Sequence, residues 1–370
     1  MKQTILTADN KFFQLDEYII QHGMKNILLV CGKSFDKLNL SNHLKEFANN
    51  TNIKISKFSD FRPNPDYNSV VKGVEVFRTN YCDSIIAVGG GSAMDVAKCI
   101  KLYANMSDNS NYLNQEIVPN KIPFIAVPTT AGTGSEATRF AVIYYKSEKQ
   151  SVNHESCIPS AVLFDTSVLE TLPEYQRKAT MMDAFCHAVE SFWSVNSTED
   201  SKEDSRRAIH LILTNYESYL ANNADGNENM LLAANYAGKA INVTQTTAGH
   251  AMCYKLTGLY GISHGHAAAL CVSVLWQYMI FNTKLCIDLR GRGYLEKTFT
   301  ELAKAMGGKV PSDGVEIFNS ILNKLELSKP NVNETDYDIL KKSVNSVRLK
   351  NNPVQLDENT INYLYHQILG

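Results

Sequence analysis

Short apolar runs alternate with longer amphipathic stretches in the first half of the chain. Apolar runs bounded by glycine or proline are typical of buried strands, and apolar residues three and four positions apart predict helices. This alternation predicts βαβ units and a mostly parallel sheet. We expect strands at Asn26–Val30, Asn52–Phe58, Ser84–Val88 and Phe124–Val127, and helices at Phe35–Asn49, Asn68–Thr79 and Ser92–Ala104.

The pattern changes at about Thr171, where helix-compatible stretches follow one another between Gly, Asn, Asp and Pro clusters. We therefore expect an α/β domain at residues 1–170 and an all-helical domain at residues 171–370. The expected helices are Glu174–Ser194, Ser201–Leu220, Asn227–Asn242, His266–Asn282, Tyr294–Met306, Gly314–Leu325, Asp336–Val347 and Glu358–Ile368.

Composition narrows the class of protein. The 36 Lys and Arg residues nearly balance 38 Asp and Glu residues, which argues against nucleic-acid or anionic-membrane partners. The eight cysteines form no C-x-x-C pair, as expected for reduced thiols. The N-terminus lacks the apolar core of a signal peptide, and the apolar run Ala267–Phe281 is too short to span a bilayer. We expect a cytoplasmic protein with no membrane association.

Two polar loops follow predicted strands. GGGSAMDVAK (Gly89–Lys98) combines three glycines with the start of a helix, an arrangement that lets backbone N–H groups bind a phosphate. PTTAGTGSEAT (Pro128–Thr138) offers hydroxyl groups suited to phosphate, ribose and carboxamide contacts. Each loop alone is also compatible with a ligand-free turn. Two such loops after successive strands favour a dinucleotide.

A set of histidines indicates a metal. Asp183 and His187 lie four residues apart, so a helix places both side chains on one face. With His250 and His264 they supply one carboxylate and three imidazoles, which suit Fe²⁺ or Zn²⁺. A helical Asp–His pair alone is more often a surface contact or a cap, and the two further histidines favour the metal. We expect His266 to be a core histidine with a hydrogen-bond partner.

These segments resemble the iron-containing (group III) alcohol dehydrogenase family over nearly the whole chain. GGGSAMDVAK is similar to the family's pyrophosphate motif and PTTAGTGSEAT to its nicotinamide-side Thr/Ser loop. MMDAFCHAVESFWS and GHAMCYKLTGLYGISHGHA are similar to its two metal-binding segments. The resemblance implies a Rossmann-like domain followed by a helical metal-binding domain, a layout shared with dehydroquinate synthase. It also implies a homo-oligomer.

The resemblance assigns roles to individual residues. It implies hydride transfer between nicotinamide and a small alcohol or aldehyde whose oxygen is polarised by Fe²⁺ or Zn²⁺. The implied metal ligands are Asp183, His187, His250 and His264. The implied dinucleotide contacts are Gly89, Gly90, Gly91, Ser92, Asp95, Thr129, Thr130, Thr133 and Ser135, with Lys149 at the nicotinamide ribose.

The chain departs from the family pattern just after His250. Many relatives carry a histidine four residues later, often assigned to proton relay, where this chain has Tyr254. With an unperturbed pKa of about 10, tyrosine is a poorer relay near neutrality. Lys255 would need an anionic partner if buried, and an anionic substrate would supply one. YKLTGLYGISHGHA resembles the branch that reduces phosphonoacetaldehyde to 2-hydroxyethylphosphonate, which predicts that Lys255 binds the phosphonate.

The cofactor preference is predicted from the turn after the first strand. NAD-selective relatives often carry an acidic residue there to bind the ribose 2′-hydroxyl. This chain has Gly32, Lys33 and Ser34 instead, which predicts that NADPH is accepted and, if either cofactor is preferred, is the preferred one.

Several alternatives stay open from the sequence. The favoured function is phosphonoacetaldehyde reduction, and the runner-up is a generic short-chain alcohol, aldehyde or diol oxidoreductase. A lyase resembling dehydroquinate synthase and a non-enzymatic metal-binding or redox-sensing protein are less favoured. The sequence does not separate Fe²⁺ from Zn²⁺ or define the oligomeric state.

Overall fold

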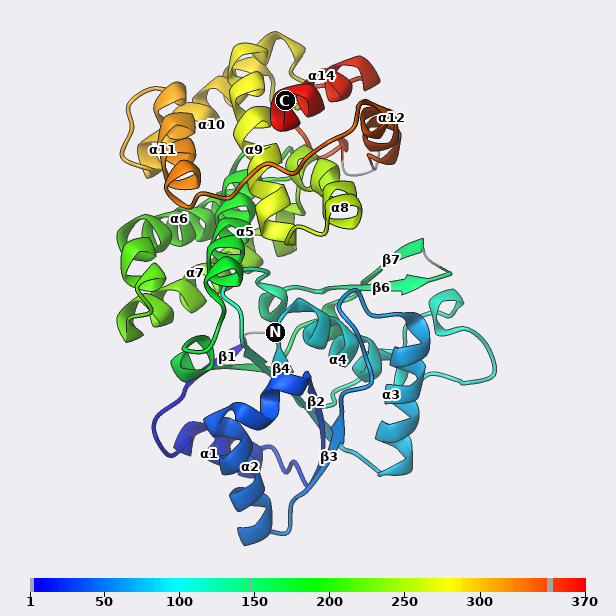
Figure 1. The fold of residues 1–370 in the computed structure, drawn as a ribbon. Helices are drawn as coiled ribbons and strands as arrows, with labels where there is room; N and C mark the ends of the chain where they lie inside the picture. The colour runs from blue at the N-terminus through cyan, green and yellow to red at the C-terminus, as the bar shows by residue number, and fades with distance from the viewer. Residues whose placement is uncertain (1–2, 147, 345–348) are drawn as a thin grey trace. The chain divides into compact units, whose positions relative to one another are not determined.

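The computed structural model describes residues 3–146, 148–344 and 349–370. The chain forms two compact units, one comprising Met1–Thr130 with Gly134–Leu172 and the other Ala131–Thr133 with Pro173–Gly370. The first unit is α/β and the second is helical, so the expected fold class is confirmed (Figure 1). Three residues of the second polar loop, Ala131–Thr133, group with the helical unit.

A six-stranded parallel sheet forms the first unit. Its strands are β1 (Thr4–Thr7), β2 (Asn26–Cys31), β3 (Lys54–Phe58), β4 (Ser84–Gly89), β5 (Phe124–Pro128) and β8 (Ala161–Phe164), and its helices are α1 (Phe13–Gln21), α2 (Asn39–Asn50), α3 (Tyr67–Thr79) and α4 (Gly91–Tyr103). The strand order is β1-β8-β5-β4-β2-β3. The inner strands are apolar and buried, as a parallel sheet covered on both faces requires. Figure 1 shows α1 and α2 on one side of the sheet and α3 and α4 on the other.

This topology brings the predicted cofactor loops to one edge. Strand β4 pairs with β2 on one side and with β5 on the other. Because all three strands are parallel, the segments that follow them leave the same edge of the sheet. The Thr129 amide donates to the carbonyl of Gly89 at 3.0 Å, so the loop that follows β4 touches the loop that follows β5.

Some elements of the first unit differ from expectation. Strands β1 and β8, helix α1 and an antiparallel hairpin of β6 (Phe140–Tyr145) and β7 (Glu148–Asn153) were not expected. The single helix expected at Phe35–Asn49 is wrong. A 3₁₀ turn at Lys33–Lys37 precedes α2, and the extended backbone of Leu38 separates the two. Strand β3 begins at Lys54 rather than at Asn52.

Helix α5 is central to the second unit. The helices are α5 (Glu174–Trp193), α6 (Glu199–Leu220), α7 (Ala224–Thr244), α8 (Ala248–Tyr260), α9 (His264–Phe281), α10 (Arg292–Ala305), α11 (Pro311–Lys324), α12 (Glu334–Ser343) and α14 (Glu358–Leu369). Helix α5 packs against α6, α7, α9 and α10. Its whole C-terminal half is buried, so the polar side chains of His187, Glu190 and Ser191 are held among apolar neighbours.

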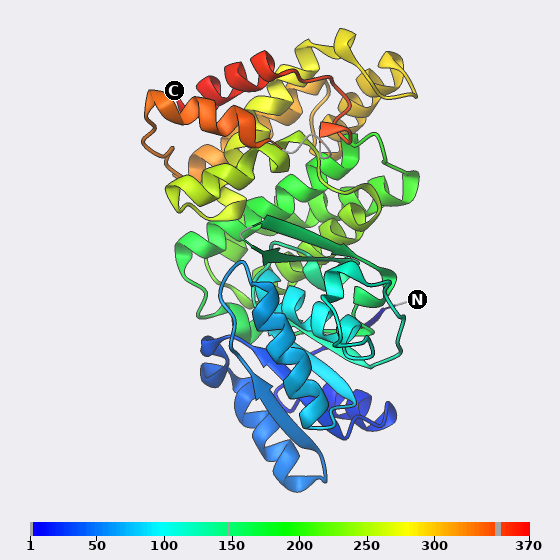
Figure 2. The same cartoon turned by 90° about the vertical axis from the view of Figure 1, so that its right-hand side faces the viewer.

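The C-terminal part of the chain adds further helices. Helices α12 and α14 lie side by side (Figure 2). The helix expected at Asp336–Val347 begins within α12, and residues 345–347 lie outside the described part of the chain. None of the described helices combines the length and apolarity that crossing a membrane would require.

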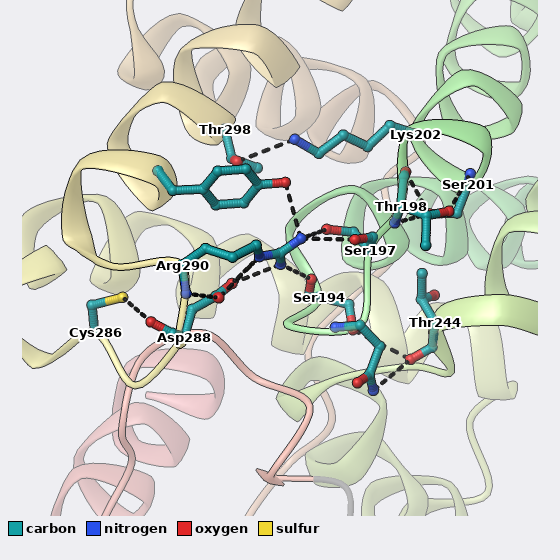
Figure 3. A network of polar contacts seen from close by, with 12 residues as sticks. Ser194, Ser197, Thr198, Ser201, Lys202, Thr244, Cys286, Asp288, Arg290 and Thr298 are labelled. Carbon is teal, nitrogen blue, oxygen red and sulfur yellow. Dashed lines mark hydrogen bonds and ion pairs between the residues drawn. The ribbon is translucent and has the colours of Figure 1, made fainter.

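A polar network closes the C-terminal end of α5 (Figure 3). Arg290 donates to the Asp288 carboxylate at 2.7 Å and to the carbonyl oxygens of Ser194 at 2.9 Å and Ser197 at 2.7 Å. Lys202, from α6, donates to Thr298 of α10 at 3.3 Å. Arg290 therefore binds the carbonyl of Ser194, the C-cap of α5, and that of Ser197 in the turn that follows. These contacts anchor the segment before α10 to the helix that carries Asp183.

Candidate metal centre and cofactor loops

Helix α5 presents three ionisable side chains on one buried face. Asp183, His187 and Glu190 occupy positions i, i+4 and i+7, which a helix stacks above one another. Their exposed fractions are 3%, 6% and 0%. Buried charges need partners or a metal, so this face must be completed by groups from other helices.

Helices α8 and α9 complete it with imidazoles. The Nε2 atoms of His250, His187 and His264 lie 3.5, 3.9 and 4.0 Å from Asp183 Oδ1. Asp183 Oδ1 and His250 Nε2 are buried, and neither has a hydrogen-bond partner among the described residues. Two donors each about 2.1 Å from one ion at the tetrahedral angle would lie roughly 3.4 Å apart. The observed spacing and the unpaired atoms therefore fit a metal.

The third histidine, His264, lies at the edge of this cluster. Asp183, His187 and His250 have ligand atoms within 4.8 Å of one another. The His264 side chain is 38% exposed, whereas the other three are buried. An open side is what a catalytic metal site needs for substrate, in contrast to a closed structural site.

A glycine permits the close approach of α9 to α5. A Cβ atom at Gly265 would lie 2.0 Å from the carbonyl oxygen of Ala179 and 2.7 Å from Asp183 Cβ. Only glycine fits between the two helices at this point. Its position next to His264 explains how that histidine reaches Asp183.

The ionisable groups of this cluster shift one another's pKa values. Burial alone would raise the pKa of Asp183, but the surrounding imidazoles of His187, His264 and His250 hold it well below its usual range. Burial lowers the pKa of His187 to about 4, so this imidazole is neutral and able to bind a metal. Burial also disfavours the charged form of His250, yet the carboxylates of Glu190 and Asp183 raise its pKa to about 9. Metal binding would therefore displace a proton from His250.

Glu190 is a site residue that the sequence analysis missed. Its carboxylate accepts hydrogen bonds from the Thr247 hydroxyl at 2.6 Å and from His250 Nδ1. A carboxylate behind a metal-binding imidazole is a recurrent arrangement that fixes the ring. The available signal was its spacing, seven residues after Asp183 on the same face of a helix.

Tyr254 and Lys255 lie on α8 beyond His250. The Tyr254 ring stacks on the His264 ring with centroids 5.4 Å apart. At 3.6 residues per turn, Tyr254 lies about 40° around the helix from His250 and Lys255 about 140°. Lys255 is partly exposed and forms no hydrogen bond or ion pair within the described segments. Tyr254 is thus beside the cluster, and Lys255 starts from another face of the helix.

His266 is a core histidine, as expected. It is 3% exposed, and its Nδ1 is 3.1 Å from the Tyr175 hydroxyl. It lies on α9 two residues beyond His264 and takes no place among the atoms that surround Asp183.

The first cofactor loop ends β4 and begins α4. Gly90 is the N-cap of α4 and makes no side-chain cap, so the first N–H groups of the helix are not used by a capping side chain. Gly89, Gly90, Gly91 and Ser92 are all partly exposed. This is the geometry expected of an anion-binding helix N-terminus.

A buried lysine ties that helix to the second loop. Lys98 is fully buried, and its Nζ donates to Ser135 Oγ and Thr138 Oγ1 at 3.0 Å each and to the Phe140 carbonyl at 2.7 Å. Ser135 Oγ in turn donates to Asp95 at 3.2 Å. Asp95 and Ser135 therefore connect the two loops to each other, and their contact with a dinucleotide stays a prediction.

The remaining predicted contacts are distributed along the two units. Thr129 and Thr130 are partly exposed directly after β5, whereas Thr133 groups with the helical unit. Gly32 precedes the 3₁₀ turn that starts at Lys33, and both Lys33 and Ser34 are exposed. Lys149 lies on β7, close enough for its charge to lower the pKa of Asp95. Their roles in cofactor binding stay predictions.

Known proteins resemble both units. Residues 3–166 match the model of the iron-containing alcohol dehydrogenase family, and residues 178–369 match the model of its C-terminal region. Alcohol dehydrogenase 4 of Schizosaccharomyces pombe is 33% identical over 250 residues, 66% of this chain and 59% of that protein. The 1,3-propanediol dehydrogenase of Citrobacter freundii is 35% identical over 254 residues, 67% of this chain and 65% of that protein. These matches span less than two thirds of either relative.

A solved structure matches over the whole chain. The sulfoacetaldehyde reductase of Bifidobacterium kashiwanohense, in complex with NAD⁺, has a TM-score of 0.87 and is 25% identical, and the match covers 100% of this chain and 97% of that one. The two family models together account for both units, including the segments that hold Asp183, His187, His250 and His264. The chain belongs to the iron-containing alcohol dehydrogenase family.

Proposed function

We propose that this protein is a metal-dependent, NAD(P)H-linked alcohol dehydrogenase or aldehyde reductase. The observation that carries this proposal is the convergence of three imidazoles on one oxygen of Asp183, with two of the buried donor atoms left unpaired. No hydrogen bond among the described residues uses these atoms, whereas a divalent ion would.

The chemistry follows from the donors and the loops. A divalent ion supplies Lewis acidity toward the oxygen of an alcohol or aldehyde, and a nicotinamide supplies or accepts hydride. Asp183, His187, His250 and His264 would hold the ion. The N-terminus of α4 would bind the pyrophosphate, and the network around Lys98 would fix the loop that faces the nicotinamide. The protein's contribution is alignment and exclusion of water.

We assign Tyr254 as the candidate proton relay. It lies one turn after His250 and stacks on His264, which places it beside the proposed ligands. Tyr254→Phe keeps the ring and removes the hydroxyl. We expect it to lower kcat without changing metal content.

For the substrate we propose a small aldehyde with an anionic head group, phosphonoacetaldehyde being the favoured example. Two observations support this. The structural relative from Bifidobacterium kashiwanohense is named for sulfoacetaldehyde, an aldehyde with a sulfonate. Lys255 is a partly exposed cation without an ion-pair partner within the described segments.

A neutral short-chain aldehyde or diol is the second candidate. The position of Lys255, about 140° around α8 from His250, favours it because the ammonium group must then reach around the helix to meet a substrate. The relative from Citrobacter freundii is named for 1,3-propanediol. The two candidates differ in whether Lys255 affects substrate choice.

The test is NAD(P)H oxidation with phosphonoacetaldehyde, propanal and lactaldehyde in wild type, Lys255→Ala and the control Lys239→Ala on α7. The anionic-substrate proposal predicts a preference for the phosphonate that Lys255→Ala abolishes through KM and Lys239→Ala leaves intact. Equal rates with neutral aldehydes in all three proteins would favour the second candidate. Turnover without net nicotinamide oxidation would instead indicate a lyase.

A further inference from the structure

The Glu190 carboxylate accepts hydrogen bonds both from the His250 ring and from the start of α8. Its Oε1 accepts from the Thr247 amide at 3.1 Å, the Thr247 hydroxyl at 2.6 Å and the His250 amide at 3.3 Å. Its Oε2 accepts from His250 Nδ1. The side chain is 0% exposed, so no solvent replaces any of these donors.

The three donors to Oε1 belong to the first turn of α8. Thr247 is the N-cap of that helix, yet its own side chain caps no backbone N–H group. Glu190, which belongs to α5, caps α8 instead, because its Oε1 accepts from the backbone N–H groups of Thr247 and His250. A carboxylate is also favoured at the positive end of a helix.

Gly249 makes the arrangement sterically feasible. A Cβ atom there would lie 2.5 Å from Val272 Cγ2 and 3.1 Å from Glu190 Oε1. Any side chain would push the carboxylate away from the start of α8. Residues Thr247–His250 therefore pack directly against the Glu190 carboxylate.

We propose that Glu190 is a positioning residue that fixes the tautomer of His250, with the proton on Nδ1 and the Nε2 lone pair directed at the metal. This inference rests on the proposed metal centre. Because Oε1 is fully used by the start of α8, Oε2 is held against Nδ1 and only the N–H form of Nδ1 fits. Once the metal has displaced the Nε2 proton, Nε2 faces Asp183 as a ligand atom while Nδ1 keeps its proton.

Glu190→Gln is the decisive variant because an amide cannot satisfy both sides. If its oxygen takes the Oε1 position, its NH₂ group faces Nδ1 and forces the proton of His250 onto Nε2, where it blocks the metal. If the amide flips, its NH₂ group faces the two backbone N–H groups of α8. The first orientation therefore blocks the metal, and the second opposes donor to donor in a buried place.

The experiment is a Zn²⁺ titration of the metal-free protein against a chromophoric chelator, with thermal unfolding followed in parallel. We expect wild type to bind one Zn²⁺ per chain and Glu190→Gln to bind about 10–100-fold more weakly. Asp288→Asn is the control, since it neutralises another buried carboxylate of the same unit away from the site. It should lower the unfolding temperature and leave Zn²⁺ affinity unchanged.

Wild-type affinity in Glu190→Gln would overturn the inference and leave the proposed function standing. Failure of the wild type itself to bind Zn²⁺ stoichiometrically would overturn the metal centre on which both depend. A second measurement needs no variant and serves if Glu190→Gln does not fold. Long-range ¹H–¹⁵N spectra of zinc-loaded wild type should show His250 protonated at Nδ1, and a proton at Nε2 would refute the assignment.

Discussion

Replacing Lys98 by methionine tests whether the two cofactor loops are held by one buried cation. Methionine keeps most of the volume of the lysine stem and removes the ammonium group. Three acceptors then lose their donor: Ser135 Oγ, Thr138 Oγ1 and the Phe140 carbonyl. Asp95 also loses its strongest stabilising charge, since Lys98 is the main influence that opposes the effect of burial on its pKa.

The magnitude follows from these losses. A buried polar group left unsatisfied costs about 1–3 kcal/mol, but removal of the ammonium group relieves its own desolvation. We expect a net destabilisation of about 3 kcal/mol. For a domain of this size that is a fall of roughly 6–12 °C in the unfolding temperature. Cofactor affinity should fall as well, because the loop after β5 loses its support.

The stability loss caused by Lys98→Met should depend on pH in a direction set by the pKa of Asp95. Burial raises the pKa of Asp95 to about 6, above the ordinary value of 3.8, so the folded protein binds this proton more tightly than the unfolded chain. Loss of Lys98 raises that pKa further. The stability deficit of Lys98→Met should therefore be largest at about pH 8 and shrink toward about pH 5, where the carboxyl group is neutral.

The assay is thermal unfolding at several pH values, with NAD(P)H binding followed by fluorescence. Lys101→Met is the matched control, since this buried lysine of α4 has the Ser156 carbonyl as its single acceptor within the described segments. Asp95→Asn combined with Lys98→Met should recover part of the loss. The reasoning is refuted if Lys98→Met unfolds like wild type at about pH 8, or if its deficit grows as the pH falls.

Three further predictions concern separate parts of the chain. Gly265→Ala should destabilise the protein by about 3 kcal/mol and weaken Zn²⁺ binding, because the added Cβ meets the Ala179 carbonyl and Asp183; unchanged Zn²⁺ titration would contradict this. Arg290→Ala should cost roughly 2–3 kcal/mol by removing charged donors from Asp288 and the end of α5, and chemical denaturation measures it. Lys33→Ala should lower kcat/KM for NADPH and not for NADH, and a loss with both cofactors would show that Lys33 does not contact the 2′-phosphate.

The pairing of Asp183 with His187 could be predicted from the sequence because its signal is local. The four-residue spacing of Asp183 and His187 fixes a common face once the segment is helical. The approach of His250 and His264 depends on how α8 and α9 pack on α5, which no spacing encodes. Glu190 was missed for a related reason, because a glutamate in a helix resembles any solvated residue until α8 is placed over it.

Helix α1 and strands β1 and β8, which the sequence analysis missed, have no recognisable cap or are very short. Helix α1 starts after Phe12, whose left-handed backbone and apolar side chain provide no recognisable cap. Strands β1 and β8 have four residues each, so their pairing in the sheet defines them more than their sequence does. The division of Phe35–Asn49 falls at Leu38, whose backbone is extended.

The central claim is that a metal at Asp183, His187, His250 and His264 supports hydride transfer to an aldehyde. The most direct test is to remove metal with a chelator, reload with Fe²⁺ or Zn²⁺, and follow NAD(P)H oxidation by an aldehyde in wild type and in Asp183→Asn. We predict that chelation abolishes turnover, that reloading restores it in wild type, and that Asp183→Asn neither binds metal tightly nor recovers. Full aldehyde reduction by the metal-free protein, or by Asp183→Asn, would contradict the claim.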